Sequence, residues 1–142
     1  MFDTSHLHPM LVHFPIALVL FGFLFELASI IFKKETWLSK AGFYLLVIGT
    51  LAAVATWLSG FIFTSDMSGA AGKIKETHEL FATVTIGLLL ITSAFRIILM
   101  IREIQSAGLK WIGTALYALA ALCVTFTGFY GGTLVYSYMM PL

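Results

Sequence analysis

Long apolar runs separated by short polar stretches dominate the chain. Four of these runs reach the length that a membrane-spanning helix needs, about 20 mostly apolar residues. They cover about residues 9–32, 41–63, 76–101 and 109–136. Because a span in lipid must satisfy its own backbone hydrogen bonds, runs of this length indicate helices rather than the strands of a barrel. The pattern predicts an all-α integral membrane protein, a four-helix bundle formed as a single domain by residues 1–142.

The composition agrees with a membrane protein. Hydrophobic residues make up 60% of the chain and charged residues 11%, and the mean hydropathy is +0.99. Soluble domains have about 45–50% apolar and about 25% charged residues, so this chain lacks the polar surface that a soluble protein needs. A net charge of +1 without a basic run gives no indication of nucleic-acid binding. The single cysteine, Cys123, excludes an internal disulfide and a thiolate cluster.

The distribution of basic residues favours one orientation in the membrane. Six of them lie in or beside the first and third loops: Lys33, Lys34, Lys40, Arg96, Arg102 and Lys110. The second loop has only Lys73 and Lys75, and the N-terminal tail has none. By the positive-inside rule, the first and third loops face the cytoplasm and both termini lie on the periplasmic side. We therefore expect a multi-pass protein of the bacterial inner membrane.

All four histidines fall on the predicted periplasmic side. His6, His8 and His13 lie in "SHLHPMLVHFP", and His78 opens the third span. His8 stands near the start of the first helix, and His13 lies four residues beyond Pro9, about 6 Å deeper. Polar side chains inside a membrane span are costly and usually functional. His13 and His78 are therefore the strongest candidate ligands, whereas His6 and His8 have ready structural explanations as a solvated side chain and a helix cap.

Proline and glycine residues shape the same end of the predicted bundle. Pro15 lacks the amide hydrogen that would bond Leu11, so the first helix should bend there. Small residues recur at helical spacing in the second, third and fourth spans, which usually means close helix packing. Gly60, Gly128 and Gly131 lie level with the histidines, and there they could make room for a flat macrocycle.

Three hypotheses account for the histidines. In the first, His13 and His78 bind one b-type haem between two helices, since facing helices of bundles commonly build cofactor sites and histidine is a common haem ligand. His8 would tune that site, and Gly60, Gly128 and Gly131 would line it. In the second, the histidines bind copper or zinc or handle protons. In the third, they are structural.

Two further charged residues lie within the predicted spans. Glu26 lies towards the cytoplasmic half of the first span, and Arg96 lies at a comparable depth in the third. An ion pair between them would lower the cost of burying both charges. Glu26 lies 18 residues, five helical turns, from His8, so both project from one face of the helix. A structural pair and a proton path through Glu26 are the two interpretations.

Three features of the sequence resemble one family. The motif "HPMLVHFPIAL" at 8–18, the lone His78 opening the third span and "GGTLVY" at 131–136 are similar to the DUF2231 group of small bacterial membrane proteins. The resemblance covers nearly the whole chain, although "SGFIFTSD" after the second span departs from the family's usual Gly-Leu and Trp. Such relatives are often joined to, or encoded near, Rieske or cytochrome-type redox modules, and the resemblance thus implies electron transfer.

The sequence therefore predicts a membrane electron-transfer subunit that binds one haem b near the periplasmic face through His13 and His78. Its expected partners are membrane lipid and a periplasmic cytochrome, a Rieske-type protein or a quinone. It would not catalyse bond chemistry on its own, and we expect a homo-oligomer or a subunit of a larger complex. The alternative is a non-redox membrane subunit, or a protein that uses the histidine cluster to handle a metal or protons.

Overall fold

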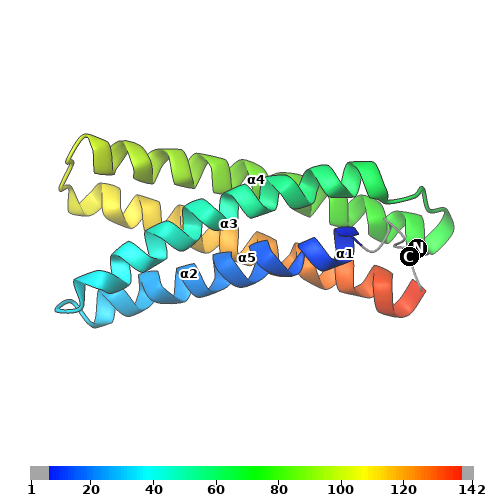
Figure 1. Cartoon of the computed structure of the whole chain (residues 1–142), viewed down its shortest axis with the longest axis horizontal. Coiled ribbons are helices and arrows are strands. Elements are labelled where there is room, and N and C mark those ends of the chain that lie inside the picture. The colour runs from blue at the N-terminus through cyan, green and yellow to red at the C-terminus, as the bar shows by residue number, and fades with distance from the viewer. Residues whose placement is uncertain (1–6, 139–142) are drawn as a thin grey trace.

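A computed structural model describes residues 7–138, and helices account for most of this range (Figure 1). The elements in chain order are α1 (Leu7–Leu11), α2 (His13–Ile31), α3 (Thr36–Phe63), α4 (Gly69–Ile101) and α5 (Ala107–Tyr138). Helices α1 and α2 together form the first candidate span, Leu7–Ile31, and α3, α4 and α5 form the other three. All four are long and apolar enough to cross a membrane, which confirms the four predicted spans.

The third span begins earlier than its apolar run predicts. Helix α4 starts at Gly69, whereas the apolar run that predicts it begins at about residue 76. Gly69 has a φ of +66°, a backbone conformation that glycine adopts at little cost. This residue turns the chain out of the loop, and the first two turns of α4 carry polar side chains. His78 is therefore well inside its helix.

The four spans form an antiparallel bundle. Helix α2 packs along α3 and helix α4 along α5, and the two hairpins meet through α2 with α5 and α3 with α4 (Figure 1). Helices α2 and α4 are thus diagonally opposite each other across the bundle. Any side chains of α2 and α4 that meet must do so at its centre.

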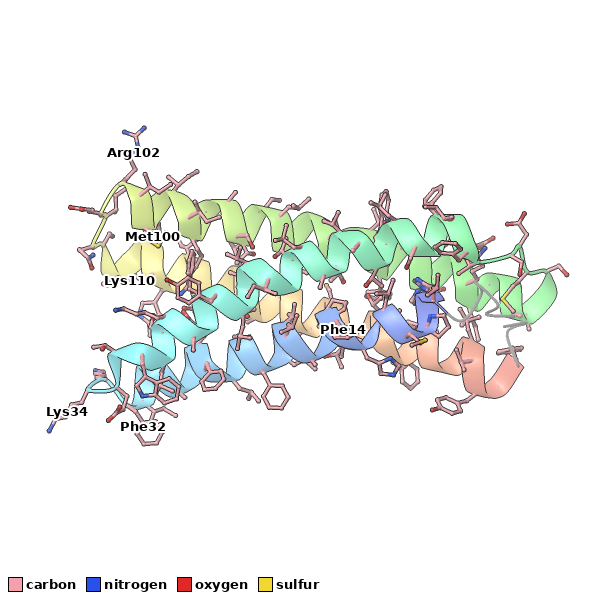
Figure 2. The ribbon with its side chains drawn as sticks, viewed as in Figure 1. Phe14, Phe32, Lys34, Met100, Arg102 and Lys110 are labelled. Atoms are coloured by element: carbon pink, nitrogen blue, oxygen red, sulfur yellow. The ribbon has the colours of Figure 1, made fainter. Side chains whose placement is uncertain are left out.

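Basic side chains gather at one end of this bundle. Figure 2 shows Lys34, Arg102 and Lys110 together at the end that carries the α2–α3 and α4–α5 loops. The α3–α4 loop and the two outer helix ends, at Leu7 and Tyr138, lie at the opposite end (Figure 1). The positive-inside prediction that the basic end faces the cytoplasm stays a prediction.

The core combines a few large side chains with many small ones. Val19, Leu46, Leu89 and Tyr117 have no exposed surface, and Ala53, Ala120, Ala121 and Val124 pack with them. Most other large apolar side chains point outwards, as lipid contact requires. Small residues let the helix backbones approach closely, which is how helices associate where the lipid is as apolar as the protein.

Hydroxyl groups connect the two hairpins and the helices within one hairpin. Thr50 and Ser93 share a hydrogen bond of 2.8 Å between α3 and α4, and Thr85 and Thr127 share one of 3.1 Å between α4 and α5. Thr50 donates its proton to the Leu46 carbonyl, so Ser93 is the donor of the first bond. In the second, one of the two threonines donates to the other, and its partner donates to a carbonyl one turn back. These hydroxyls hold neighbouring helices together.

Substitution of Gly42 tests how closely α2 packs on α3. A Cβ at this position would lie 3.0 Å from the Gly22 carbonyl oxygen and 3.2 Å from the Glu26 amide nitrogen. Both neighbours are backbone atoms, so Gly42→Ala should destabilise the protein by about 1–3 kcal/mol through overpacking. Gly87 has no atom within 4 Å of such a Cβ, and Gly87→Ala should be neutral or stabilise by up to about 1 kcal/mol. Thermal unfolding in detergent measures both, and equal effects would contradict this packing.

Candidate functional site

A break in the first span sets the position of His8. Helix α1 ends at Leu11, and α2 begins at His13. Pro15 cannot donate to the Leu11 carbonyl, and the Thr56 hydroxyl of α3 donates to that oxygen instead, at 3.3 Å. The free carbonyl thus contacts the neighbouring helix, and α1 packs against α3. Val12, between α1 and α2, keeps a helical backbone with φ −60° and ψ −25°, so a bend at Pro15 stays a prediction.

The contact of α1 with α3 turns the imidazole ring of His8 into the bundle. The side chain is partly buried, and its Nδ1 lies 2.9 Å from the Ser59 hydroxyl. Ser59 donates its only hydroxyl proton to the Thr56 carbonyl, at 2.6 Å. The Ser59 oxygen must therefore accept from His8, so the proton of the neutral ring is on Nδ1 and its Nε2 keeps a lone pair.

His78 is held in the same way in the other hairpin. Its Nδ1 lies 2.9 Å from the Thr127 carbonyl oxygen of α5. A carbonyl can only accept, so Nδ1 of His78 carries a proton and Nε2 is left with a lone pair when the ring is neutral. An Nδ1–H bond to a backbone carbonyl is the usual way in which proteins fix the tautomer and orientation of a histidine that binds a metal through Nε2.

The two anchored imidazoles lie at the same end of the bundle. His8 belongs to the first span and His78 to the diagonally opposite helix α4. Both rings are partly buried, at the end away from the loops that carry Lys34 and Arg102. The structure thus turns two of the predicted site residues, His8 and His78, towards the second helix of their own hairpins.

His13 does not join them, and its predicted inward orientation is wrong. The side chain is exposed, and its Nδ1 lies 2.8 Å from the Pro9 carbonyl of its own span. The buried face of α2 passes through Pro15, Val19, Gly22 and Glu26. His13 is two residues before Pro15, which is about 200° around a helix. The haem pair predicted from sequence, His13 with His78, therefore does not face inward from both sides.

The role predicted for the glycines also changes. A Cβ on Gly60 would lie 3.0 Å from Cε1 of His8, and one on Gly131 would lie 3.0 Å from Cε1 of His78. At Gly128, the neighbour is the Ile16 side chain, at 3.1 Å. Gly60 and Gly131 thus make room for the imidazoles themselves, and Gly128 makes room for an apolar side chain, rather than for a macrocycle.

The number of protein ligands in reach bears on whether the two imidazoles would bind a metal ion or a haem. His6, the remaining histidine, lies outside the described residues. Within residues 7–138, no three side chains among His, Cys, Asp and Glu come together as a metal-binding group. Two imidazoles leave a tetrahedral zinc site incomplete, whereas the iron of a haem needs only two axial ligands from the protein because the porphyrin supplies the other four. Within the described residues, the two imidazoles match the number of protein ligands that a haem iron would need.

A second polar centre lies in the half of the bundle that contains the α2–α3 and α4–α5 loops. Arg96 donates two hydrogen bonds to the Glu26 carboxylate, at 2.6 and 2.8 Å, which confirms the predicted ion pair. Thr114 of α5 donates a third, at 2.8 Å. Both charged side chains are largely buried, at 14% and 7% exposure. Removing one partner of such a pair costs about 3–5 kcal/mol, because the other charge stays buried.

Tyr117 adjoins this centre and has no partner of its own. Its hydroxyl is buried without a hydrogen bond to any of the described residues, and it lies where a Cβ on Gly22 would be. Its ring packs edge-on against Phe23, 5.6 Å away. A buried hydroxyl of this kind usually binds an internal water.

Sequence reasoning did not identify Ser59, Thr127 and Thr114, which anchor the two imidazoles and the carboxylate. Hydroxyl residues in membrane helices usually donate to their own helix, so the sequence carries no signal for the few that also face a neighbour. A signal for His8 was present, since it lies on one helical face with Glu26. The structure shows that this face is the buried one.

Comparison with known proteins places the chain in a family. The family model described as "Predicted membrane protein (DUF2231)" matches residues 4–141. The chain therefore belongs to the DUF2231 family, as its motifs suggested. No curated protein and no solved structure matches it.

The tautomers of the two anchored histidines can be measured directly. Nitrogen chemical shifts of ¹⁵N-histidine-labelled protein should show His8 and His78 protonated on Nδ1 when neutral. The reason is that the Thr127 carbonyl can only accept, and the Ser59 hydroxyl donates its own proton to Thr56. Ser59→Ala should alter the His8 signals and leave those of His78 unchanged. Two Nε2-protonated rings would contradict the hydrogen-bond assignment.

Proposed function

We propose that this DUF2231 protein binds one haem b between His8 and His78 and serves as an electron-transfer subunit of a bacterial inner membrane. The observation that carries the proposal is the matched anchoring of the two rings. Each imidazole has its Nδ1 proton committed to an acceptor of its own hairpin, so Nε2 of each ring is the atom left to bind a ligand. Axial ligation from two sides is what such a pair can supply.

The protein residues would orient the ligands and exclude other chemistry. Ser59 and Thr127 fix the planes of the two rings, and Gly60 and Gly131 provide the space in which the rings stand. His8 and His78 would both be engaged in holding the haem, which favours electron transfer over catalysis. The haem, when bound, supplies one-electron redox chemistry.

Aromatic side chains beside His78 suit a flat, apolar ligand. Phe81, one turn after His78, stacks on Tyr130 at 5.6 Å and on Phe126 at 5.4 Å between ring centroids. Tyr130 directly precedes Gly131, against which the His78 ring lies. A macrocycle held by His8 and His78 would thus have an aromatic cluster near its edge, where face or edge contacts contribute about 0.5–1.5 kcal/mol each.

The orientation predicted from the lysines and arginines determines at which face of the membrane the haem would exchange electrons. It puts His8 and His78 near the periplasmic face, about 18 residues from the Glu26–Arg96 level on each helix. Electrons would pass between this haem and a periplasmic cytochrome, a Rieske-type protein or a quinone. The chain has a mass of 15.6 kDa. A protein this small would work as one subunit of a larger assembly or as a homo-oligomer.

The absorption spectrum of the purified protein tests this proposal. Protein produced with sufficient haem should be coloured, with a Soret band that shifts and sharpens on reduction. His8→Ala and His78→Ala should each lower haem affinity by at least tenfold, because each removes one axial ligand.

His13→Ala is the matched control, because it removes an exposed imidazole of the same span, five residues after His8. It should leave the spectrum unchanged. A protein that binds no haem when reconstituted, or one whose haem depends on His13 as much as on His8, would overturn the proposal. Stoichiometric copper or zinc binding that needs His8 and His78 would instead support the metal-handling alternative.

A further inference from the structure

The two charged positions of the core and the two anchored histidines share one spacing. Glu26 follows His8 by 18 residues, and Arg96 follows His78 by the same 18. Glu26 and Arg96 are 70 positions apart in the chain, as are His8 and His78. Each hairpin therefore begins with a histidine and carries a charge five helical turns further along the same helix.

The buried faces of the first helix in each hairpin match at the same offset. Residues of α2 and α4 that are 70 positions apart form three buried pairs: Pro15 with Thr85, Val19 with Leu89, and Gly22 with Thr92. These pairs, the histidines and the charges follow one another along the inward face of both helices, and Ser93, which is also buried, has the partly buried Phe23 as its counterpart. The helix ends match as well, since Ile31 and Ile101 are also 70 apart.

The second helices match at an offset of 71. Residues of α3 and α5 at this offset pair small with small and polar with polar in several places: Gly42 with Gly113, Gly49 with Ala120, Ala53 with Val124, Thr56 with Thr127, and Gly60 with Gly131. The loop between α4 and α5, residues 102–106, is one residue longer than that between α2 and α3, residues 32–35. This extra residue explains the change from 70 to 71.

The contacts repeat along with the residues. The Gly60 position faces the His8 ring at 3.0 Å, and Gly131 faces His78 at 3.0 Å. Thr127 accepts from His78 through its carbonyl, and the carbonyl of Thr56, its equivalent, is linked to the His8 ring through the Ser59 hydroxyl.

The same holds at the other polar centre. The Gly42 position faces the backbone of Glu26, and the Gly113 position faces the Arg96 side chain at 3.1 Å. Equivalent glycines thus contact equivalent partners in both hairpins, near each end of the bundle.

We infer that the chain consists of two copies of one histidine-bearing helical hairpin, related by a pseudo-two-fold axis along the bundle, and that the Glu26–Arg96 pair sets how the copies meet. Because the two equivalent positions carry opposite charges, the first hairpin pairs with the second. Two copies of the first hairpin would bring two carboxylates together, and two copies of the second would bring two guanidinium groups together. Like charges facing each other out of water cost several kcal/mol.

The pair also fixes the relative height of the hairpins. An arginine that donates two parallel hydrogen bonds to one carboxylate tolerates little displacement along the helix axis. Glu26 and Arg96 stand at the same level of diagonal helices, so this geometry holds His8 and His78 at a common level as well. Glu26 and Arg96 are therefore positioning residues for the imidazole pair, a role that rests on the proposed function.

Exchange of the two charges tests the equivalence of the positions. In the full chain, Glu26→Arg alone and Arg96→Glu alone should each lower the melting temperature in detergent, by on the order of 10 °C if a buried like-charge pair costs several kcal/mol. The double variant Glu26→Arg/Arg96→Glu should recover at least half of that loss. Recovery should be incomplete, because Thr114 donates to Glu26 and the equivalent residue of α3 is Phe43.

A surface charge exchange provides the control. Lys73 and Glu76 are both exposed near the start of α4, and exposed charges contribute little. Lys73→Glu/Glu76→Lys should leave the melting temperature within about 2 °C. If the charge-reversed single variants do not accumulate in cells, Glu26→Gln and Arg96→Gln replace them as the reference for recovery.

Two readouts separate this inference from the proposed function. A double variant as unstable as the single variants would overturn the pairing role of Glu26 and Arg96, whatever the protein binds. A double variant that recovers stability but binds haem as weakly as the single variants would overturn their positioning role. If the parent protein binds no haem, the proposed function fails, and the melting temperatures still decide the equivalence of the two hairpins.

Discussion

Every polar group inside a lipid-embedded bundle must find its partner within the protein, and this constraint accounts for most of the structure. Water would satisfy a free carbonyl or a charge at the surface of a soluble protein, but it is absent from the hydrocarbon region. The Leu11 carbonyl that Pro15 leaves free is therefore bound by Thr56. Glu26 likewise receives three donated hydrogen bonds, two from Arg96 and one from Thr114.

The same constraint explains why the histidines divide into two kinds. His13 lies on the outer face and satisfies one ring nitrogen on its own helix. His8 and His78 turn inward, and each satisfies Nδ1 on the second helix of its hairpin. Their Nε2 atoms are the remaining polar positions, so these atoms are where a ligand has the most to gain. The proposed haem site follows from this unequal use of the two ring nitrogens.

The repeated hairpin gives a simple origin for a two-sided site. A duplicated unit that carries one anchored imidazole generates a facing pair when its copies meet about an axis. Only one pair of equivalent core positions then needs opposite charges to distinguish the halves, and Glu26 with Arg96 meets this need. The small residues shared by α3 and α5, such as Gly42 and Gly113, let the backbones come close enough for the ion pair to close across the bundle.

Much of the architecture was determined by the sequence itself. The four apolar runs predicted the four spans, Pro15 predicted the free carbonyl of Leu11, and the depths of Glu26 and Arg96 predicted their pair, because hydropathy and proline geometry act locally along the chain. Local sequence could not identify which histidine of the first span faces inward as His78 does. His13 and His8 differ by five residues, about 500° around a helix, and only the packing of α2 against α3 and α5 decided which of them faces inward. Tertiary contacts also decided that Ser59 and Thr127 anchor the two rings, because a hydroxyl or carbonyl in a sequence gives no sign of which helix lies opposite it.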